Sequence, residues 1–174
     1  LLISGGSGTV SSANVATYSS SAINEGTLTL GNGANGGLAS NYTLTDHASS
    51  SFQINQRVLN SSGSRIYDGS TTASSSDLTL SNLVGTETLT LSGNGTLANA
   101  NVATNKSVTL NTLSIADGSN GGLAANYILA GGTHQLSVTK RVLNATGTRL
   151  YDASTNANAS DLSLGNLVGS ETLV

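Results

Sequence analysis

The chain has 174 residues, a formal net charge of −3 and 9% charged residues, against about 25% in an average soluble domain. It contains 21 glycines and 37% hydrophobic residues, so it is too apolar and too weakly charged to be intrinsically disordered. It has no basic excess, few aromatic residues and no apolar run of roughly 20 residues, which argues against nucleic-acid binding and against membrane insertion of this segment.

Short runs in which apolar and polar residues alternate predict half-buried strands along the chain. In chain order, the clearest runs are Leu78–Leu80, Leu89–Leu91, Val108–Leu110, Leu113–Ile115 and Leu136–Val138. Turn-forming pairs stand between the runs: Asp68-Gly69, Asn94-Gly95, Asp117-Gly118 and Asn120-Gly121. The best helical candidate, residues 97–105, is short and poor in charged partners. The sequence therefore predicts an all-β fold.

The sequence also repeats itself. The segment RVLNSSGSRIYDGSTTASSSDLTLSNLVGTETL begins at Arg57 and returns, with few changes, at Arg141. Counted from the chain ends, the repeats are residues 1–88 and 89–174. In the other register, residues 57–140 form one full repeat, flanked by the partial repeats 1–56 and 141–174. We expect the chain to be a window onto a longer periodic array.

Several short strands with regular turns predict tandem immunoglobulin-like β-sandwich modules. The segment Leu-Ala-x-Asn-Tyr-x-Leu occurs twice, and its Tyr42 and Tyr127 are candidates either for a tyrosine corner or for simple core residues. Tyr67 and Tyr151 are expected to fill the same cores. The alternative is a β-solenoid of about four coils of ~20 residues per period, although no such sub-period is visible.

Three motifs follow each other at fixed distances: Arg-x-Tyr-Asp-Gly-Ser-Thr-x-Ala at 65–73, Asn-Leu-Val-Gly-x-Glu at 82–87 and Asn-Tyr-x-Leu at 126–129. Together they resemble the YDG-type repeat of large bacterial adhesins, including filamentous-haemagglutinin-like exoproteins, over essentially the whole chain. The second copy reads Tyr151-Asp152-Ala153, so the motif glycine is not essential to the turn. The resemblance implies many modules in series at the surface of a Gram-negative bacterium, with no enzymatic activity.

Few residues are candidates for chemistry. His47 and His134 have no counterpart in the other copy, so we expect surface loop residues rather than catalytic ones. Ten of the charged residues recur in matched pairs, which indicates structural roles. Asp68, like its counterpart Asp152, is expected to accept hydrogen bonds from the backbone of its own turn. The alternative is an ion pair with an arginine across a module junction.

The sequence offers candidates for two other kinds of site. Asp117-Gly-Ser-Asn-Gly-Gly has oxygen donors at alternate positions, as Ca²⁺ requires, but its counterpart begins with Asn32 and lacks the carboxylate. An Asn/Gly turn is therefore the better prediction, and no metal or cofactor is expected. Sequons for glycosylation, expected by chance in such a composition, occur at Asn41, Asn60, Asn94, Asn105, Asn144 and Asn158.

These observations predict a structural repeat that builds an extracellular stalk or fibre for adhesion or a biofilm matrix. Its partners would be neighbouring copies of the same repeat, because low charge and Ser/Thr-rich strands leave the sheet edges poorly protected against association. Two other classes of function are alternatives. An adhesive module that binds a host or bacterial glycan or protein is the first alternative, and an enzyme is the second.

Overall fold

The computed structural model of the protein describes residues 2–45 and 49–173. Strands and short 3-10 turns make up the regular structure of these residues, so the predicted all-β fold is confirmed. None of their helices is long and apolar enough to cross a membrane. The chain divides into two compact units: residues 1–57 with 125–128, and residues 58–124 with 129–174. Each unit is described by itself.

The first unit consists mainly of three antiparallel strand pairs. The pairs are β1 (Leu2–Gly5) with β5 (Thr29–Gly31), β2 (Thr9–Val10) with β4 (Ile23–Asn24), and β3 (Ala16–Ser19) with β6 (Ser51–Ile54). The 3-10 turns η1 (Ser20–Ala22) and η2 (Ala39–Asn41) connect them. Strand β15 (Tyr127–Ile128) pairs with β7 (Arg57–Val58). Among residues 2–45 and 49–57, Tyr18 on β3 is the buried hydrophobic residue, with 7% of its surface exposed.

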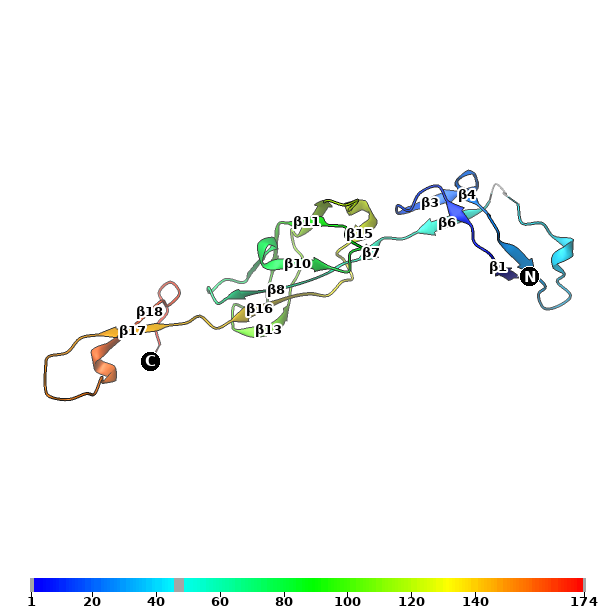
Figure 1. Ribbon diagram of the computed structural model, residues 1–174. Helices are drawn as coiled ribbons and strands as arrows, with labels where there is room; N and C mark the ends of the chain where they lie inside the picture. Colours follow the sequence, from blue (N-terminus) through cyan, green and yellow to red (C-terminus); the bar gives the residue numbers. More distant parts are fainter. Residues whose placement is uncertain (1, 46–48, 174) are drawn as a thin grey trace. The chain divides into compact units, whose positions relative to one another are not determined.

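The second unit is built on a four-stranded mixed sheet in the order β10-β8-β16-β13 (Figure 1). Its strands are β8 (Asn60–Ile66), β10 (Leu78–Ser81), β13 (Ala103–Ser107) and β16 (His134–Thr139). The two central strands, β8 and β16, are parallel and in continuous register from His134 opposite Ser61 to Thr139 opposite Ile66. The sheet therefore joins strands that lie far apart in the sequence.

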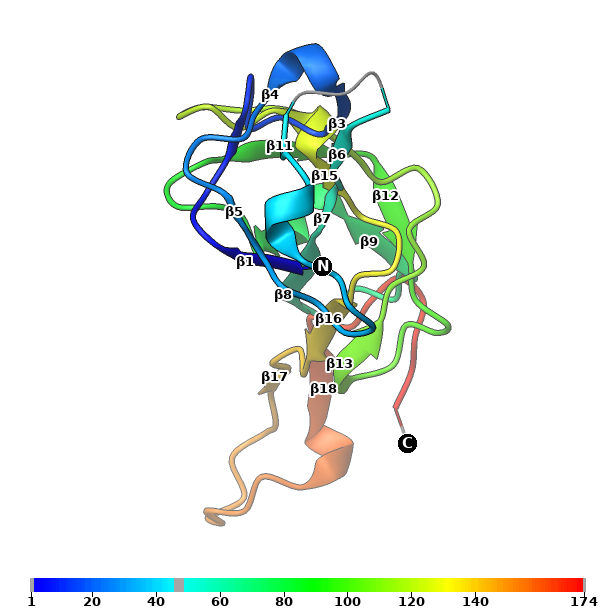
Figure 2. The ribbon, with the colours of Figure 1, turned by 90° about the vertical axis from the view of Figure 1, so that its right-hand side faces the viewer.

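Further antiparallel pairs complete this unit (Figure 2). They are β9 (Thr72–Ser74) with β12 (Asn94–Thr96), β11 (Leu89–Ser92) with β14 (Ser114–Asp117), and β17 (Asn144–Gly147) with β18 (Leu162–Gly165). The 3-10 turns are η3 (Ser75–Asp77), η4 (Ala124–Asn126) and η5 (Ala159–Asp161), of which η4 lies on the border with the first unit.

Buried hydrophobic side chains of the second unit come from strands β9, β10 and β16 and from loop segments. Leu136 is 0% exposed and Val138 is 2% exposed, because the side chains of one face of β16 point inward with the strand period of two. Leu59, directly before β8, is also 0% exposed. Ala73, Leu78, Leu97, Val108, Leu113 and Leu129 are also buried. The alternation predicted around Leu136 and Leu78 is therefore confirmed.

The predicted turn at Asn94-Gly95 was wrong, because these residues form strand β12. Gly95 is buried, and a Cβ atom there would lie 2.5 Å from Cγ1 of Val108 and 2.6 Å from the carbonyl oxygen of Thr109. This glycine permits a close approach of backbone and side chains rather than a reversal of the chain.

Candidate functional site: the Tyr-Asp turn

The turn that follows β8 is held by one arginine and one aspartate. Oδ1 of Asp68 accepts a hydrogen bond from the backbone N–H of Ser70 at 2.9 Å, the contact predicted from the sequence. Arg65 lies three residues upstream; its Nη1 donates to Oδ2 of Asp68 at 2.6 Å, and its Nη2 donates to the carbonyl oxygen of Ser70. The arginine partner of Asp68 thus belongs to the same turn.

The second copy builds the same turn from the corresponding residues. Arg149 donates to Asp152 and to the carbonyl oxygen of Ser154, and Asp152 accepts from the N–H of Ser154 at 2.9 Å. The residue after the aspartate has a positive φ in both copies, 75° at Gly69 and 60° at Ala153. An alanine in this conformation costs roughly 1–2 kcal/mol, so the hydrogen bonds compensate for the missing glycine.

Asp152 provides a pH-dependent test of the turn. The hydrogen bond from the Ser154 backbone, followed by that from Arg149, lowers the pKa of Asp152 below its ordinary value. Its contribution to stability is therefore complete above the unfolded pKa of about 3.9 and is lost as the pH falls through the folded pKa. In an NMR titration of the side-chain carboxyl carbon, we expect Arg149→Gln to raise the pKa only partly, because the backbone bond remains. A return to the ordinary value would contradict this ranking of the two partners.

An asparagine side chain that binds the backbone just before β8 and just before β17 recurs in both copies and was missed in the sequence. Nδ2 of Asn82 donates to the carbonyl oxygen of Val58 at 2.7 Å, and Nδ2 of Asn166 donates to that of Val142 at 2.7 Å. Both asparagines have positive φ, 72° and 68°. The signal was present, since asparagine tolerates this conformation and recurs at the start of the Asn-Leu-Val-Gly motif.

Tyr67 faces residues of the following repeat. Its hydroxyl donates to Oε1 of Glu171, and this bond, then partial burial and the nearby negative charges, raises the pKa of Tyr67 above its ordinary value. A mostly apolar pocket of about 370 Å³ adjoins it, lined by residues that include Val102, Leu143 and Val168. Tyr67 is thus half-buried at this pocket.

The four candidate tyrosines are in different environments. Tyr127 is 3% exposed, whereas Tyr42 is 56% and Tyr151 is 94% exposed. The prediction that Tyr151 fills a core was therefore wrong for this chain, because none of the described residues covers the ring. A corner-like bond is found elsewhere: the Tyr18 hydroxyl donates to the carbonyl oxygen of Asn14 at 2.6 Å.

The prediction that His134 is a surface loop residue was wrong. It lies on β16, is 6% exposed, and bridges Oγ of Ser61 at 2.9 Å and the carbonyl oxygen of Leu129 at 2.8 Å. The residue is a satisfied core histidine, and its periodic position in the alternating strand was the signal that could have found it. His47 lies outside the described residues.

The candidate calcium loop is an ordinary polar turn. Oδ1 of Asp117 accepts from the N–H of Ala124 at 2.7 Å, and Oδ1 of its counterpart Asn32 accepts from the N–H of Ala39 at 2.8 Å. The neutral amide of Asn32 thus accepts the same backbone hydrogen bond as the carboxylate of Asp117. Within residues 2–45 and 49–173, no three His, Cys, Asp or Glu side chains are grouped in a way that could hold a metal ion.

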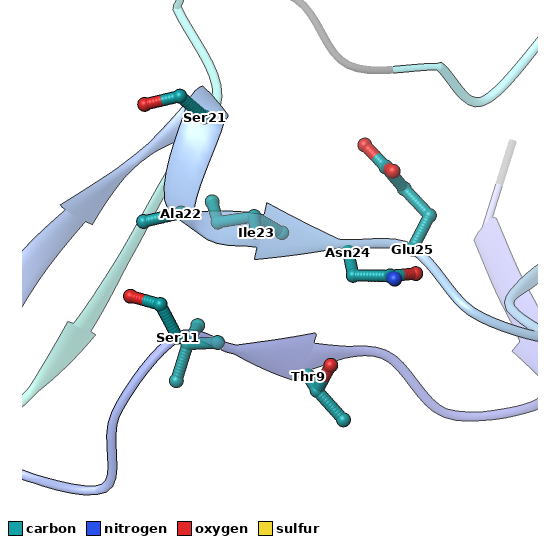
Figure 3. A pocket seen from close by; sticks show the side chains of 8 residues that line it. Thr9, Ser11, Ser21, Ala22, Ile23, Asn24 and Glu25 are labelled. Carbon is teal, nitrogen blue, oxygen red and sulfur yellow. The ribbon is translucent and has the colours of Figure 1, made fainter.

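A second pocket, of about 510 Å³, lies over β2 and β4 (Figure 3). Polar side chains of Thr9, Ser11, Asn24 and Glu25 line it together with the apolar Ile23. Glu25 is its acidic residue, and the central repeat has Leu110 at the corresponding position. The lining thus combines one carboxylate with hydroxyl and amide groups.

Comparison with known proteins identifies the central part of the chain. Residues 53–135 match the model of the YDG domain family, a range that contains most of the four-stranded sheet and the Tyr-Asp turn. The YDG part of the predicted resemblance is therefore confirmed for these residues. No curated protein and no solved structure matches the chain.

Proposed function

We propose that the chain is a structural repeat segment of a secreted protein on the surface of a Gram-negative bacterium, where it builds an extracellular stalk or fibre for adhesion or a biofilm matrix. The recurrence of one structure at fixed spacing carries this proposal. Asn60 pairs with Ser81 and Gly63 with Leu78; 84 positions later, Asn144 pairs with Gly165 and Gly147 with Leu162. A unit that is rebuilt in the same register along a chain is suited to an extended array.

The full repeat is proposed to be a small immunoglobulin-like β-sandwich. The four-stranded sheet would form one layer and the pairs β11–β14 and β9–β12 would contribute to the other, with Leu59 and Leu136 between them. The burial of Tyr127 fits the core role expected for it. A β-solenoid is the alternative architecture.

Neighbouring repeats are the proposed partners. The contact of Tyr67 with Glu171 joins side chains that belong to successive repeats. Both residues recur, as Tyr151 and Glu87, so the same contact can form at each junction of an array. We assign the chain no catalytic role and no cofactor.

Images of the native material test this proposal. We expect filaments whose power spectrum shows an axial repeat of roughly 35–45 Å, as for modules in line with strands that rise ~3.3 Å per residue along the fibre. A strong meridional reflection at ~4.8 Å would instead mean strands stacked across the axis, as in a solenoid or a cross-β fibre. Antibody labelling of intact cells gives the second readout, since a stalk must be accessible from outside.

A further inference from the structure

The two ends of the chain carry the two halves of one sheet. In the central repeat, the order β10-β8-β16-β13 is held together in its middle by the parallel pair β8–β16. The pair β17–β18 repeats β8–β10, and the pair β3–β6 repeats β13–β16. Cutting the central sheet between β8 and β16 therefore yields the two-stranded sheets that occur at the two ends.

The N-terminal half, residues 2–45 and 49–56, exposes side chains whose counterparts are buried. Phe52 is 54% exposed and its counterpart Leu136 is 0% exposed. Tyr42 is 56% exposed against 3% for Tyr127, and Leu44 is 37% exposed against 8% for Leu129. These residues are equivalent positions of the sequence repeat. Within the described residues, this half carries one side of a core whose other side is not present.

The C-terminal half, residues 141–173, shows the complementary deficit. Leu162 is 41% exposed, whereas its counterpart Leu78 is 7% exposed. Ala157 is exposed, whereas Ala73 is 0% exposed in the central repeat. Ala73 lies on β9, the strand that pairs with β12. Strand β2 is the counterpart of β12. The C-terminal half therefore holds the counterpart of β9, the strand that is missing beside β2.

The pocket in Figure 3 marks the place that this segment would fill. Val10 and Ile23 line it and are half-buried, whereas their counterparts Leu97 and Val108 are 5% and 6% exposed. In the described residues of the first unit, β2 pairs only with β4, while β12 of the central repeat pairs with β9. The pocket thus lies where the counterpart of β9 would cover the core.

We propose that residues 141–173 of one copy of the chain and the N-terminal half of a second copy assemble into one complete repeat. This inference rests on the proposed structural function and names the surface that would serve it. By the register of the central repeat, β6 would add to β17 in parallel, with Phe52 opposite Gly147 as Leu136 lies opposite Gly63. Strands β6 and β17 contain no charged residue, so their pairing desolvates no charged side chain.

The 174-residue polypeptide tests the proposal in sedimentation and light-scattering measurements from low to high micromolar concentration. We expect its mass to at least double with concentration, and the Tyr42 and Phe52 backbone amides to gain protection from hydrogen exchange. A polypeptide that stays monomeric overturns the proposal. So does protection of these amides in a monomer, because the halves would then close within one chain.

Two variants distinguish this pairing of an N-terminal half with a C-terminal half from nonspecific association. Phe52→Asp damages only the N-terminal half and Leu162→Asp only the C-terminal half, so each variant alone should be monomeric. Mixed in equal amounts, they should form a dimer, because each supplies the half that the other lacks. Association of either variant alone, or a mixture that stays monomeric, overturns the proposal. NMR spectra of the central repeat, which neither substitution touches, report whether each variant is folded.

Leu38→Asp is the matched control. Leu38 is 49% exposed, and its counterpart Leu123 remains 39% exposed in the complete repeat, so assembly should not cover this position. The variant should associate as the unmodified chain does, and loss of association would overturn the proposed geometry. A failed assembly would leave the stalk proposal standing, since one long polypeptide can supply both halves of each repeat, whereas the axial spacing tests the stalk itself.

Discussion

Replacing Gly63 by alanine is expected to unfold the central repeat or leave it barely stable. Gly63 lies in the middle of β8, opposite Leu78, and a Cβ atom there would lie 1.7 Å from the carbonyl oxygen of Asp77. The contact is with backbone, so the strands β8 and β10 themselves would have to separate. Overpacking costs 1–3 kcal/mol where side chains can adjust, and we expect about 3 kcal/mol or more here.

Urea unfolding followed by NMR signals of β8 and β16 measures this effect. A domain of this size has a total stability of roughly 5–15 kcal/mol, so the expected loss is a large part of it. Ser64→Ala, at an exposed position of the same strand, is the matched control and should change the midpoint little. A Gly63→Ala variant as stable as this control would show that β8 and β10 can separate at little cost.

Leu136→Ala is expected to destabilise the central repeat by about 2–5 kcal/mol, because it removes a fully buried side chain and leaves a cavity on the inner face of β16. Alanine at the equivalent position of the first repeat, Phe52→Ala, should lower the stability by less than about 1 kcal/mol when the chain is monomeric. Phe52 is 54% exposed, so water already contacts much of the ring.

The comparison of these two variants decides which register of the repeat folds as a unit. Thermal unfolding with residue-specific NMR detection assigns each change in stability to its own segment. If the core of a repeat is complete only between Arg57 and Lys140, Leu136→Ala should lose much more stability than Phe52→Ala. Equal costs at Leu136 and Phe52 would mean that the N-terminal half holds a core of its own.

The sequence predicted the elements of this fold better than their partners. Alternation identified the strands around Leu78 and Leu136, and the Asp68 turn followed from the hydrogen-bonding habit of aspartate in short turns. Both depend on residues that are close in the sequence. The parallel pairing of β8 with β16 depends on residues more than 70 positions apart, which no local pattern encodes.

The errors have the same origin. Asn94-Gly95 carries a strong turn signal, but packing against Val108 takes precedence over the local preference. Tyr67 and Tyr151 are both predicted to fill a core, yet Tyr67 is half-buried and Tyr151 is 94% exposed, because burial depends on the strands that surround a residue and not on its own type. The recurrence of Asn82 and Asn166 was visible, and only their backbone conformation explained it.

The parallel pair at the centre of the sheet also bears on how the repeat responds to a pull along the chain. Strand β8 is near the start of the repeat and β16 near its end, and they run in the same direction. Tension on the two ends therefore draws these neighbours past each other and loads their ladder, from Ser61–His134 to Ile66–Thr139, as a whole. An outward pull on a hairpin opens its bonds one at a time. Sliding one strand along another requires many bonds to break together, so a repeat connected in this way resists force from either neighbour.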